Sequence, residues 1–367
     1  MSTLYNDTPL HIDASTNIRV LEILPADDEM APIACILRVI ALQDSPKYTA
    51  LSYVWGPPTP ARNVFVNDEP FTVRENLWKF LHQARKDRRT CAFWTDAICI
   101  DQDNVPERTH QVSMMGKIYS EAELVIAWLG TATKYSAQWE RAMKTIPAFK
   151  DDEHGNFKRW YKVYGPSIMD LFDSPYWSRM WILQEYNLAR QIILQCGPHK
   201  TTGELVSSLY ETWDIFFSTH RVKKRPSFNR SLAIGVIDHY FKFFKSKNFV
   251  VFVNMTYKFS RRRACADRRD RVYALLGLCD SQKPEGNLIT PDYSKSILEL
   301  FAQLVRMILN DEKIEKYARA DLIATALPKA LMIEENELEG LDHETMGILE
   351  DHRKLYDDLR IIWNKMK

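Results

Sequence analysis

The sequence predicts an α/β fold, in which helices flank a largely parallel sheet with extra N-terminal strands, followed by a helical C-terminal extension. Two observations lead to this class. Short apolar runs alternate with amphipathic helical stretches in the first half of the chain, which is typical of βαβ units. From about residue 201 the apolar residues recur only with the helical period. We therefore expect an α/β domain over residues 1–200 and a mainly helical extension over residues 201–367.

The strands and helices are expected in regular succession. Apolar runs broken by Pro25 and Pro32 predict edge strands of an N-terminal sheet within residues 18–42. A strand over residues 48–55 should end sharply at Gly56, because two prolines follow that glycine. Further strands are expected at residues 63–66 and 70–73 (a hairpin), 91–96, 124–129 and 191–196, and helices at residues 74–86, 105–120 and 136–146.

An aromatic helix with an acid at its edge is the most informative element. Ser174 is suited to cap a helix N-terminus, and Pro175 to occupy its first position. At 3.6 residues per turn one stripe of this helix holds Trp177, Trp181, Gln184 and Leu188, with Glu185 at its edge. A buried carboxylate is costly unless it is paired. Glu185 is therefore either functional or the ion-pair partner of Arg179 or Arg190.

Composition argues against several classes of protein. Hydrophobic residues make up 46% of the 367, enough for a sizeable core, and a net charge of +1 argues against a dedicated nucleic-acid binder. Neither a secretory leader nor an apolar run of about 18 residues is visible. Six cysteines are scattered without a CxxC pair, and nine histidines show no metal-binding spacing. We expect a cytoplasmic protein with free thiols, no metal site and no integral membrane segment.

Two later segments carry opposite charge. Residues 221–271 hold fifteen Lys and Arg against three Asp and Glu, whereas residues 334–358 hold ten acids against two bases. Either both segments are solvated helix faces, or the acidic segment docks on the basic one as a lid or clasp. Residues 240–259, which mix Phe, Val and Lys, fit either a membrane-active element or helices packed on the sheet.

Several motifs between residues 48 and 190 resemble one known family. They are Tyr48-x-Ala-Leu-Ser-Tyr-x-Trp-Gly56, Glu75-Asn76-Leu77, Phe93-Trp-x-Asp-Ala-Ile-Cys-Ile-Asp-Gln102, Glu107-Arg108, Gln111-Val-x-x-Met115, Ile118-Tyr119-x-x-Ala122, Trp128-Leu-Gly130 and Arg179-x-Trp-x-x-Gln-Glu185. Their order and spacing resemble the heterokaryon-incompatibility (HET) domain of filamentous fungi. The stretches Asp270–Leu278 and Pro291–Ser294 are similar to the extension that often follows this domain. That extension usually reads Asp-Pro-Arg-Asp, where this chain has Asp267-Arg-Arg-Asp270.

The resemblance implies a role in non-self recognition, programmed cell death and fungal innate immunity. HET domains have been likened to Toll/interleukin-1 receptor (TIR) domains, which share a flavodoxin-like sheet and include NAD-cleaving members. The plant TIR pattern Ser-x-Trp-Cys-Leu-x-Glu carries a catalytic Glu, and Ser178-Arg-Met-Trp-Ile-Leu-Gln-Glu185 is similar to it. The end of the first TIR strand, Ser-Phe-Arg-Gly, is likewise similar to Ser52-Tyr-Val-Trp-Gly56. These similarities imply a TIR-like core with Glu185 as the candidate catalytic residue.

Three motifs are expected to converge at the carboxyl ends of the strands, where open α/β sheets bind ligands. They are Trp55-Gly56, the stretch from Asp96 to Gln102 and the helix bearing Glu185. Trp55 can stack on a nicotinamide or adenine ring, and Gly56 can let the backbone approach a ribose or phosphate. The alternative is that Trp55 caps the core and Gly56 makes the turn.

The remaining candidates are polar residues of the same motifs. Asp96 and Asp101 can accept hydrogen bonds from ribose hydroxyls, although Asp101 or Asp103 can equally cap the helix that follows. Arg108 and Arg179 can neutralise a diphosphate through their planar donors, or form surface ion pairs. Cys99 is expected to be a buried thiol and not a nucleophile.

The expected reaction is cleavage of the bond between nicotinamide and ribose in NAD, which makes NAD a substrate and requires no cofactor. The nicotinamide leaves as a neutral molecule, so one carboxylate that stabilises the developing positive charge can suffice. Glu185 takes this role, with Trp177 and Trp181 shaping and drying the pocket. The alternative is a non-enzymatic signalling module that self-associates to recruit a partner. In either case we expect a homo-oligomer on activation.

Overall fold

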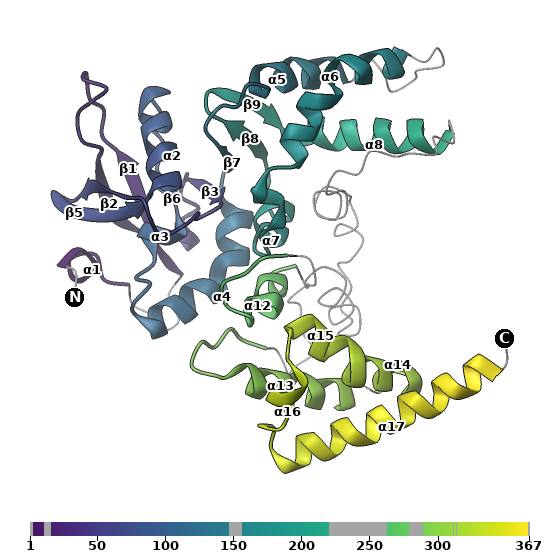
Figure 1. Ribbon diagram of the computed structural model, residues 1–367. Coiled ribbons are helices and arrows are strands. Elements are labelled where there is room, and N and C mark those ends of the chain that lie inside the picture. Colours follow the sequence, from purple (N-terminus) through teal and green to yellow (C-terminus); the bar gives the residue numbers. More distant parts are fainter. Residues whose placement is uncertain are drawn as a thin grey trace. The chain divides into compact units, whose positions relative to one another are not determined.

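The sheet of this protein has nine described strands in a mixed arrangement (Figure 1). The computed structural model describes residues 3–10, 16–146, 156–219, 263–278, 289–310, 312 and 314–365. The strands are β1 (Asn17–Ile23), β2 (Ala34–Ala41), β3 (Thr49–Tyr53), β4 (Ala61–Val66), β5 (Glu69–Arg74), β6 (Phe93–Trp94), β7 (Leu124–Gly130), β8 (Ile192–Cys196) and β9 (His199–Thr202). Their hydrogen-bonded order is β5-β4-β2-β1-β6-β3-β7-β8-β9.

The α/β class is confirmed, but the prediction of a largely parallel sheet holds only for its centre. β6, β3, β7 and β8 are parallel neighbours, and β2 is parallel to β4. The other described neighbours are antiparallel. The prediction that residues 18–42 form edge strands is wrong, because β1 and β2 lie inside the sheet and β5 and β9 form its edges. Pro25 and Pro32 fall in the connection between β1 and β2, where a missing N–H removes no ladder hydrogen bond.

Helices cover both faces of the central strands. Phe93 packs edge-to-face on Phe80 of α2 (Glu75–Lys86), with ring centroids 5.5 Å apart. The next residue, Trp94, packs in the same way on Tyr119 of α4 (Val105–Glu121). Because successive strand residues point to opposite faces, α2 and α4 lie on opposite sides of β6. Ala50 of β3 pairs with Trp94, so Ser52, two residues further along β3, also faces the α4 side.

The predicted helices at residues 74–86, 105–120 and 136–146 are confirmed as α2, α4 and α5 (Ser136–Thr145). The predicted strand at 91–96 is shorter, because α3 (Asp96–Cys99) begins directly after β6. The helix α6 (Asn156–Phe172) was not predicted from the sequence. The remaining elements of this part are α1 (Thr3–Asp7), η1 (Leu42–Asp44), η3 (Pro175–Ser178), α7 (Ile182–Asn187) and α8 (Gly203–Thr219).

The chain divides into two compact units, residues 1–240 and 241–367. The described part of the second unit is helical, as predicted for the C-terminal region. It contains α12 (Asp270–Leu276), α13 (Ile297–Asn310), α14 (Lys316–Asp321), the π-helical turn η4 (Leu322–Ala326), α15 (Leu327–Leu331), α16 (Glu335–Leu338) and α17 (His343–Lys365). Among the helices of the described residues, none combines the length and the apolar character needed to cross a membrane.

One contact in the second unit joins the two segments of opposite charge. Arg268 occupies the position of the Pro in the Asp-Pro-Arg-Asp pattern that is usual in the extension after HET domains. Its guanidinium binds Glu337 in a bidentate ion pair with a shortest N–O distance of 2.7 Å. Arg268 also donates to the carbonyl of Met332 at 2.9 Å. A residue of the basic segment therefore anchors the start of the acidic one. Residues 240–259 and most of the basic segment lie outside the described residues.

Candidate functional site

The predicted continuous helix from Ser174 to Leu188 is wrong, and its break creates the site. Ser174 does cap a helical turn, accepting a hydrogen bond from the backbone N–H of Tyr176, but this 3-10 turn (η3) ends at Ser178. Arg179 is extended, with φ −72° and ψ 145°, and α7 begins only at Ile182. In an unbroken helix, residues six apart are about 120° apart around the axis and about 9 Å apart along it. The break lets Arg179 fold back onto Glu185.

Glu185 is buried and holds three hydrogen bonds. Its side chain is 1% exposed. Arg179 donates from Nη1 to Oε2 at 3.0 Å and from Nη2 to Oε1 at 3.2 Å, which makes a bidentate ion pair. The hydroxyl of Ser52 donates to Oε2, and the hydroxyls of Ser52 and Tyr176 are 2.9 Å apart. Ser52 can reach this carboxylate because it lies on the face of β3 that α7 covers.

Asp96 and Trp55 lie beside this ion pair, at the carboxyl ends of β6 and β3. The indole Nε1 of Trp55 donates to Oδ2 of Asp96 at 2.8 Å, and the backbone N–H of Ala97 donates to Oδ1 at 2.8 Å. Unlike Glu185, Asp96 and Trp55 are only half-buried. We call Ser52, Trp55, Asp96, Arg179 and Glu185 together the Glu185 cluster.

The charges of the Glu185 cluster influence one another. Burial raises the pKa of Asp96 to about 6, and the nearby Glu185 adds to this rise, while Arg179 and the Trp55 N–H partly oppose it. Burial disfavours the charge of Arg179, but Glu185 and Asp96 together raise its pKa above the ordinary value of arginine. The guanidinium of Arg179 thus pairs with Glu185 and also acts on the charge of a second carboxylate, Asp96, whose pKa of about 6 is close to neutral pH. Such a site can stabilise positive charge and exchange a proton.

The other predicted site residues have mainly backbone roles in the structure. Gly56 follows β3 with a φ of +74°, which favours glycine, and its carbonyl accepts from Arg74 Nη1 at 2.6 Å. Trp181 is partly buried against the core, and its carbonyl accepts the N–H groups of Gln184 and Glu185 at the start of α7. The fully buried Trp177 donates to the carbonyl of Leu171.

Asp101 and Arg108 belong to the start of α4. The N-cap of α4 is Asn104, which accepts from the N–H of Glu107, so the suggestion that Asp101 or Asp103 caps this helix is wrong. The backbone N–H of Asp101 donates to Oε1 of Glu107 at 2.8 Å, and Arg108 donates to the carbonyl of Gln102 at 3.1 Å. These bonds shape the loop between α3 and α4.

Cys99 follows Asp96 on α3 and is fully buried. Burial raises the pKa of its thiol to about 12, as expected for a buried thiol. The five cysteines in the described residues are free thiols. Across those same residues, no group of three or more His, Cys, Asp or Glu is arranged to hold a metal ion.

Three residues of this region were not predicted as site residues: Ser52, Tyr176 and Arg74. Ser52 carried a signal, because it is a polar residue within an otherwise apolar predicted strand. Tyr176 lies in the predicted aromatic helix, but no function was predicted for it. The guanidinium of Arg74 lies over the ring of Trp55 at 5.1 Å. No signal in the sequence pointed to this contact, because a hairpin separates the two residues.

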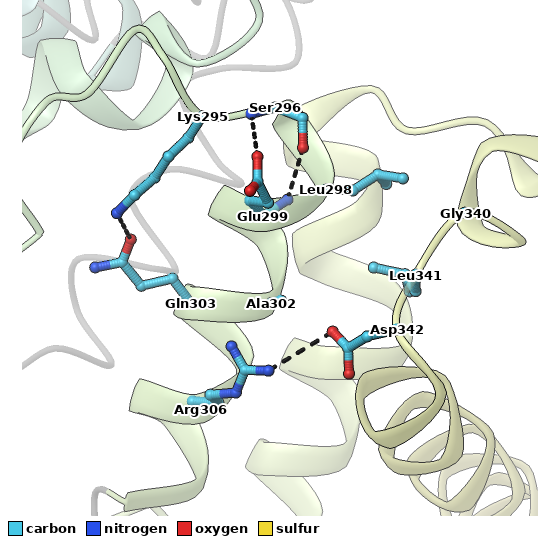
Figure 2. A pocket seen from close by; sticks show the side chains of 10 residues that line it. All are labelled: Lys295, Ser296, Leu298, Glu299, Ala302, Gln303, Arg306, Gly340, Leu341 and Asp342. Carbon is cyan, nitrogen blue, oxygen red and sulfur yellow. Dashed lines mark hydrogen bonds and ion pairs between the residues drawn. The ribbon is translucent and has the colours of Figure 1, made fainter.

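A cavity of about 510 Å³ is lined by residues of the second unit, and none of them was predicted as a site residue (Figure 2). It lies between α13 and the turn at residues 340–342. Figure 2 shows that its charged side chains have partners: Lys295 donates to Gln303, and Arg306 pairs with Asp342 at 3.6 Å. Glu299 and Asp342 also accept backbone N–H groups at the starts of α13 and α17. The charged side chains that line this cavity therefore already have partners within the second unit.

Comparisons with known proteins agree with the motifs. Residues 48–185 match the family model described as "Heterokaryon incompatibility protein (HET)". The chain is also 25% identical over 364 residues to "Heterokaryon incompatibility protein 6, OR allele" of Neurospora crassa, an alignment that covers 81% of this chain and 52% of the relative. The chain thus spans about half the length of this curated relative. No solved structure matches the chain.

Proposed function

We propose that residues 48–185 form a heterokaryon-incompatibility (HET) domain and that this protein acts in fungal non-self recognition that ends in cell death. The family match over these residues and the name of the relative from Neurospora crassa support this role. We expect the protein to act in the cytoplasm and to assemble into homo-oligomers when it is activated.

For the chemistry, the proposed activity is cleavage of NAD at the bond between nicotinamide and ribose. One observation supports it most: Asp96 follows β6 at the carboxyl end of the parallel strands, where α/β sheets bind ligands, and its carboxylate interacts electrostatically with the Arg179–Glu185 ion pair. The bond breaks through an oxocarbenium-like state, whose positive charge Glu185 would stabilise. Trp55 would stack on a ring of NAD, and Gly56 would allow a close approach of the ribose or phosphate.

This activity requires Arg179 to release Glu185, because both carboxylate oxygens are engaged in the structure. The diphosphate of NAD is a suitable competitor, since guanidinium groups bind phosphate through two parallel hydrogen bonds. Arg179 lies in an extended link between two short helical segments, so local rearrangement can move it without displacing the sheet. In this role Arg179 would first hold Glu185 and then bind the substrate. Trp181, at the start of α7, would shape the same pocket, whereas Asp101 and Arg108 would act from the neighbouring loop.

The second candidate is a non-enzymatic signalling module, and one observation favours it. Glu185 is 1% exposed and fully paired, which is also what a structural ion pair looks like. In that case the Glu185 cluster would stabilise the domain, and cell death would follow from self-association and recruitment of a partner.

The deciding experiment is incubation of the purified full chain with NAD, with measurement of free nicotinamide. The catalytic proposal predicts release by the wild type and a loss of about 1,000-fold or more in Glu185→Gln. The matched control is Glu22→Gln, the same change in an exposed acid that pairs with Arg38. Expression in a fungal host should cause death and a fall in NAD for the wild type and for Glu22→Gln. Death without a fall in NAD, unaffected by Glu185→Gln, would support the non-enzymatic module.

A further inference from the structure

We propose that Asp96 is a second catalytic residue of the Glu185 cluster, the carboxylate that accepts the proton of the attacking water. This inference rests on the proposed cleavage of NAD. In the first step the C1′–N bond breaks, and its electron pair leaves with nicotinamide. Water then forms a bond to C1′ through its oxygen, one water proton passes to Asp96, and Asp96 later releases this proton to solvent. No oxidant, reductant or further co-reactant is needed.

Glu185 and Asp96 have different surroundings, which suit the two carboxylates to different tasks. Glu185 is buried beneath Arg179 and accepts three hydrogen bonds from Arg179 and Ser52. These donors engage both carboxylate oxygens of Glu185, Oε1 through Arg179 and Oε2 through Arg179 and Ser52. Asp96 directly follows β6, at the start of α3, and as a residue it is half-buried, whereas the Glu185 side chain is 1% exposed, so Asp96 is the more accessible of the two acids. Of the two acids, Asp96 is therefore the one suited to receive a proton from water.

The carboxylate of Asp96 is held in one orientation, as a general base must be. Trp55 Nε1 donates to Oδ2 and the Ala97 N–H to Oδ1, each at 2.8 Å. Each oxygen has further acceptor capacity. Trp55 is also the ring expected to stack on the substrate, so the group that places the substrate also orients the base. This coupling would keep the attacking water beside the ribose.

The surroundings of Asp96 raise its pKa toward the range in which a general base is effective. Burial and the charge of Glu185 raise its pKa to about 6 against the opposing effects of Arg179 and Trp55. The other titratable groups that interact with it are the fully buried Tyr53, Tyr119 and Cys99, which are neutral at this pH because burial raises their pKa values. A base is most effective when its pKa lies near the working pH.

The test is the pH dependence of nicotinamide release by the full chain with NAD. For the wild type, kcat/KM should fall below about pH 6, because this profile reports the free enzyme. Asp96→Asn should lower kcat by roughly 100-fold or more and abolish this acid limb. Its amide oxygen can still accept from Trp55, so the ring should stay in place and KM should change little.

A second variant keeps the proposal testable if Asp96→Asn does not fold. Trp55→Phe removes the N–H that lowers the pKa of Asp96 and should shift the acid limb to higher pH. Asp96 is not the base if Asp96→Asn keeps the acid limb of the wild-type pH profile, or if Trp55→Phe does not shift this limb. Either result would leave the proposal of NAD cleavage by Glu185 intact. A wild type that releases no nicotinamide at any pH would overturn both proposals.

Discussion

Two buried Arg–Glu pairs in the same domain look alike but differ in their surroundings. Arg19 and Glu107 are 1% and 6% exposed, and Arg179 and Glu185 are 15% and 1% exposed. Both are bidentate. Arg19 additionally donates to the carbonyls of Thr8 and Cys99 at 2.7 Å and 3.1 Å, so it ties the N-terminal segment and α3 to the start of α4. The Arg19 pair is therefore a structural link.

The second pair has neighbours that a structural link does not need. Arg179 also interacts electrostatically with a second carboxylate, Asp96. The half-buried Trp55 donates a hydrogen bond to Asp96 and orients it. Glu185 also bonds Ser52 near the carboxyl end of β3, and Arg179 keeps part of its side chain in contact with solvent. Burial of a salt bridge is thus no evidence of function by itself. The surroundings of the second pair are the reason why it, and not the Arg19 pair, is the candidate for function.

The largest expected effect is on stability at the structural pair. Glu107→Gln should lower the free energy of unfolding by about 3–5 kcal/mol, because it leaves the charge of Arg19 buried without its partner. Glu185→Gln should cost only about 1–2 kcal/mol, since Asp96 and solvent still interact with Arg179. Urea unfolding of both variants measures the difference. Equal losses in the two variants would mean that both pairs are structural.

A smaller effect of opposite sign is expected at Asp96. Its folded-state pKa, about 6, lies above the ordinary 3.8, so the ionised carboxylate destabilises the fold. This destabilisation is complete above about pH 6 and disappears as the pH falls to about 4, where the carboxyl is protonated in both states. Asp96→Asn should therefore stabilise the protein by roughly 1–2 kcal/mol near pH 7, allowing for a lost hydrogen bond.

The measurement for Asp96→Asn is urea unfolding near pH 7 and near pH 4, compared with the wild type. The gain should shrink at the lower pH. A variant that is less stable than the wild type at both values would show that Asp96 is a structural acid. A gain in stability from removing a polar residue is typical of functional sites, where strained or charged groups are kept for activity.

The smallest effect is expected at an exposed ion pair, which gives the baseline for the comparison. Arg38 Nε lies 2.7 Å from Glu22, and the two side chains are 48% and 40% exposed. Glu22→Gln should change the free energy of unfolding by no more than about 0.5 kcal/mol, because solvent screens such pairs. Salt titration of the unfolding midpoint checks this result. A change as large as that of Glu185→Gln would remove the basis for ranking these pairs by burial.

Much of the secondary structure could be predicted because its causes are local. The helices α2, α4 and α5 follow from apolar spacing and from their flanking residues. The cap at Ser174 follows from a serine and a proline in sequence. The break at Arg179 could not be predicted in this way, since the residues on either side favour a helix. It is stabilised by bonds to Glu185, and through Glu185 to Ser52 on a distant strand.

The candidate site could be predicted in outline, and the pairing of Glu185 with Arg179 was one of the alternatives that the sequence left open. Glu185, Asp96 and Trp55 were expected at one edge of the sheet, and the structure brings them together with Arg179. Asp101 and Arg108, placed in the same motifs, shape the start of α4. Adjacent residues of one loop can point in different directions, so a motif alone does not say which of its side chains reach the site.

By itself, the sequence determined the α/β class, the helices α2, α4 and α5, the helical character of the C-terminal region, the HET-domain resemblance and the acid at the end of the aromatic segment. Each of these depends on spacing or on motifs within a short stretch of chain. Only the tertiary structure decided the mixed order of the strands, the place of β1 and β2 inside the sheet and the pairing of Glu185 with Arg179 and Ser52. These features depend on contacts between residues far apart in the chain, where packing and charge neutralisation outweigh local preference.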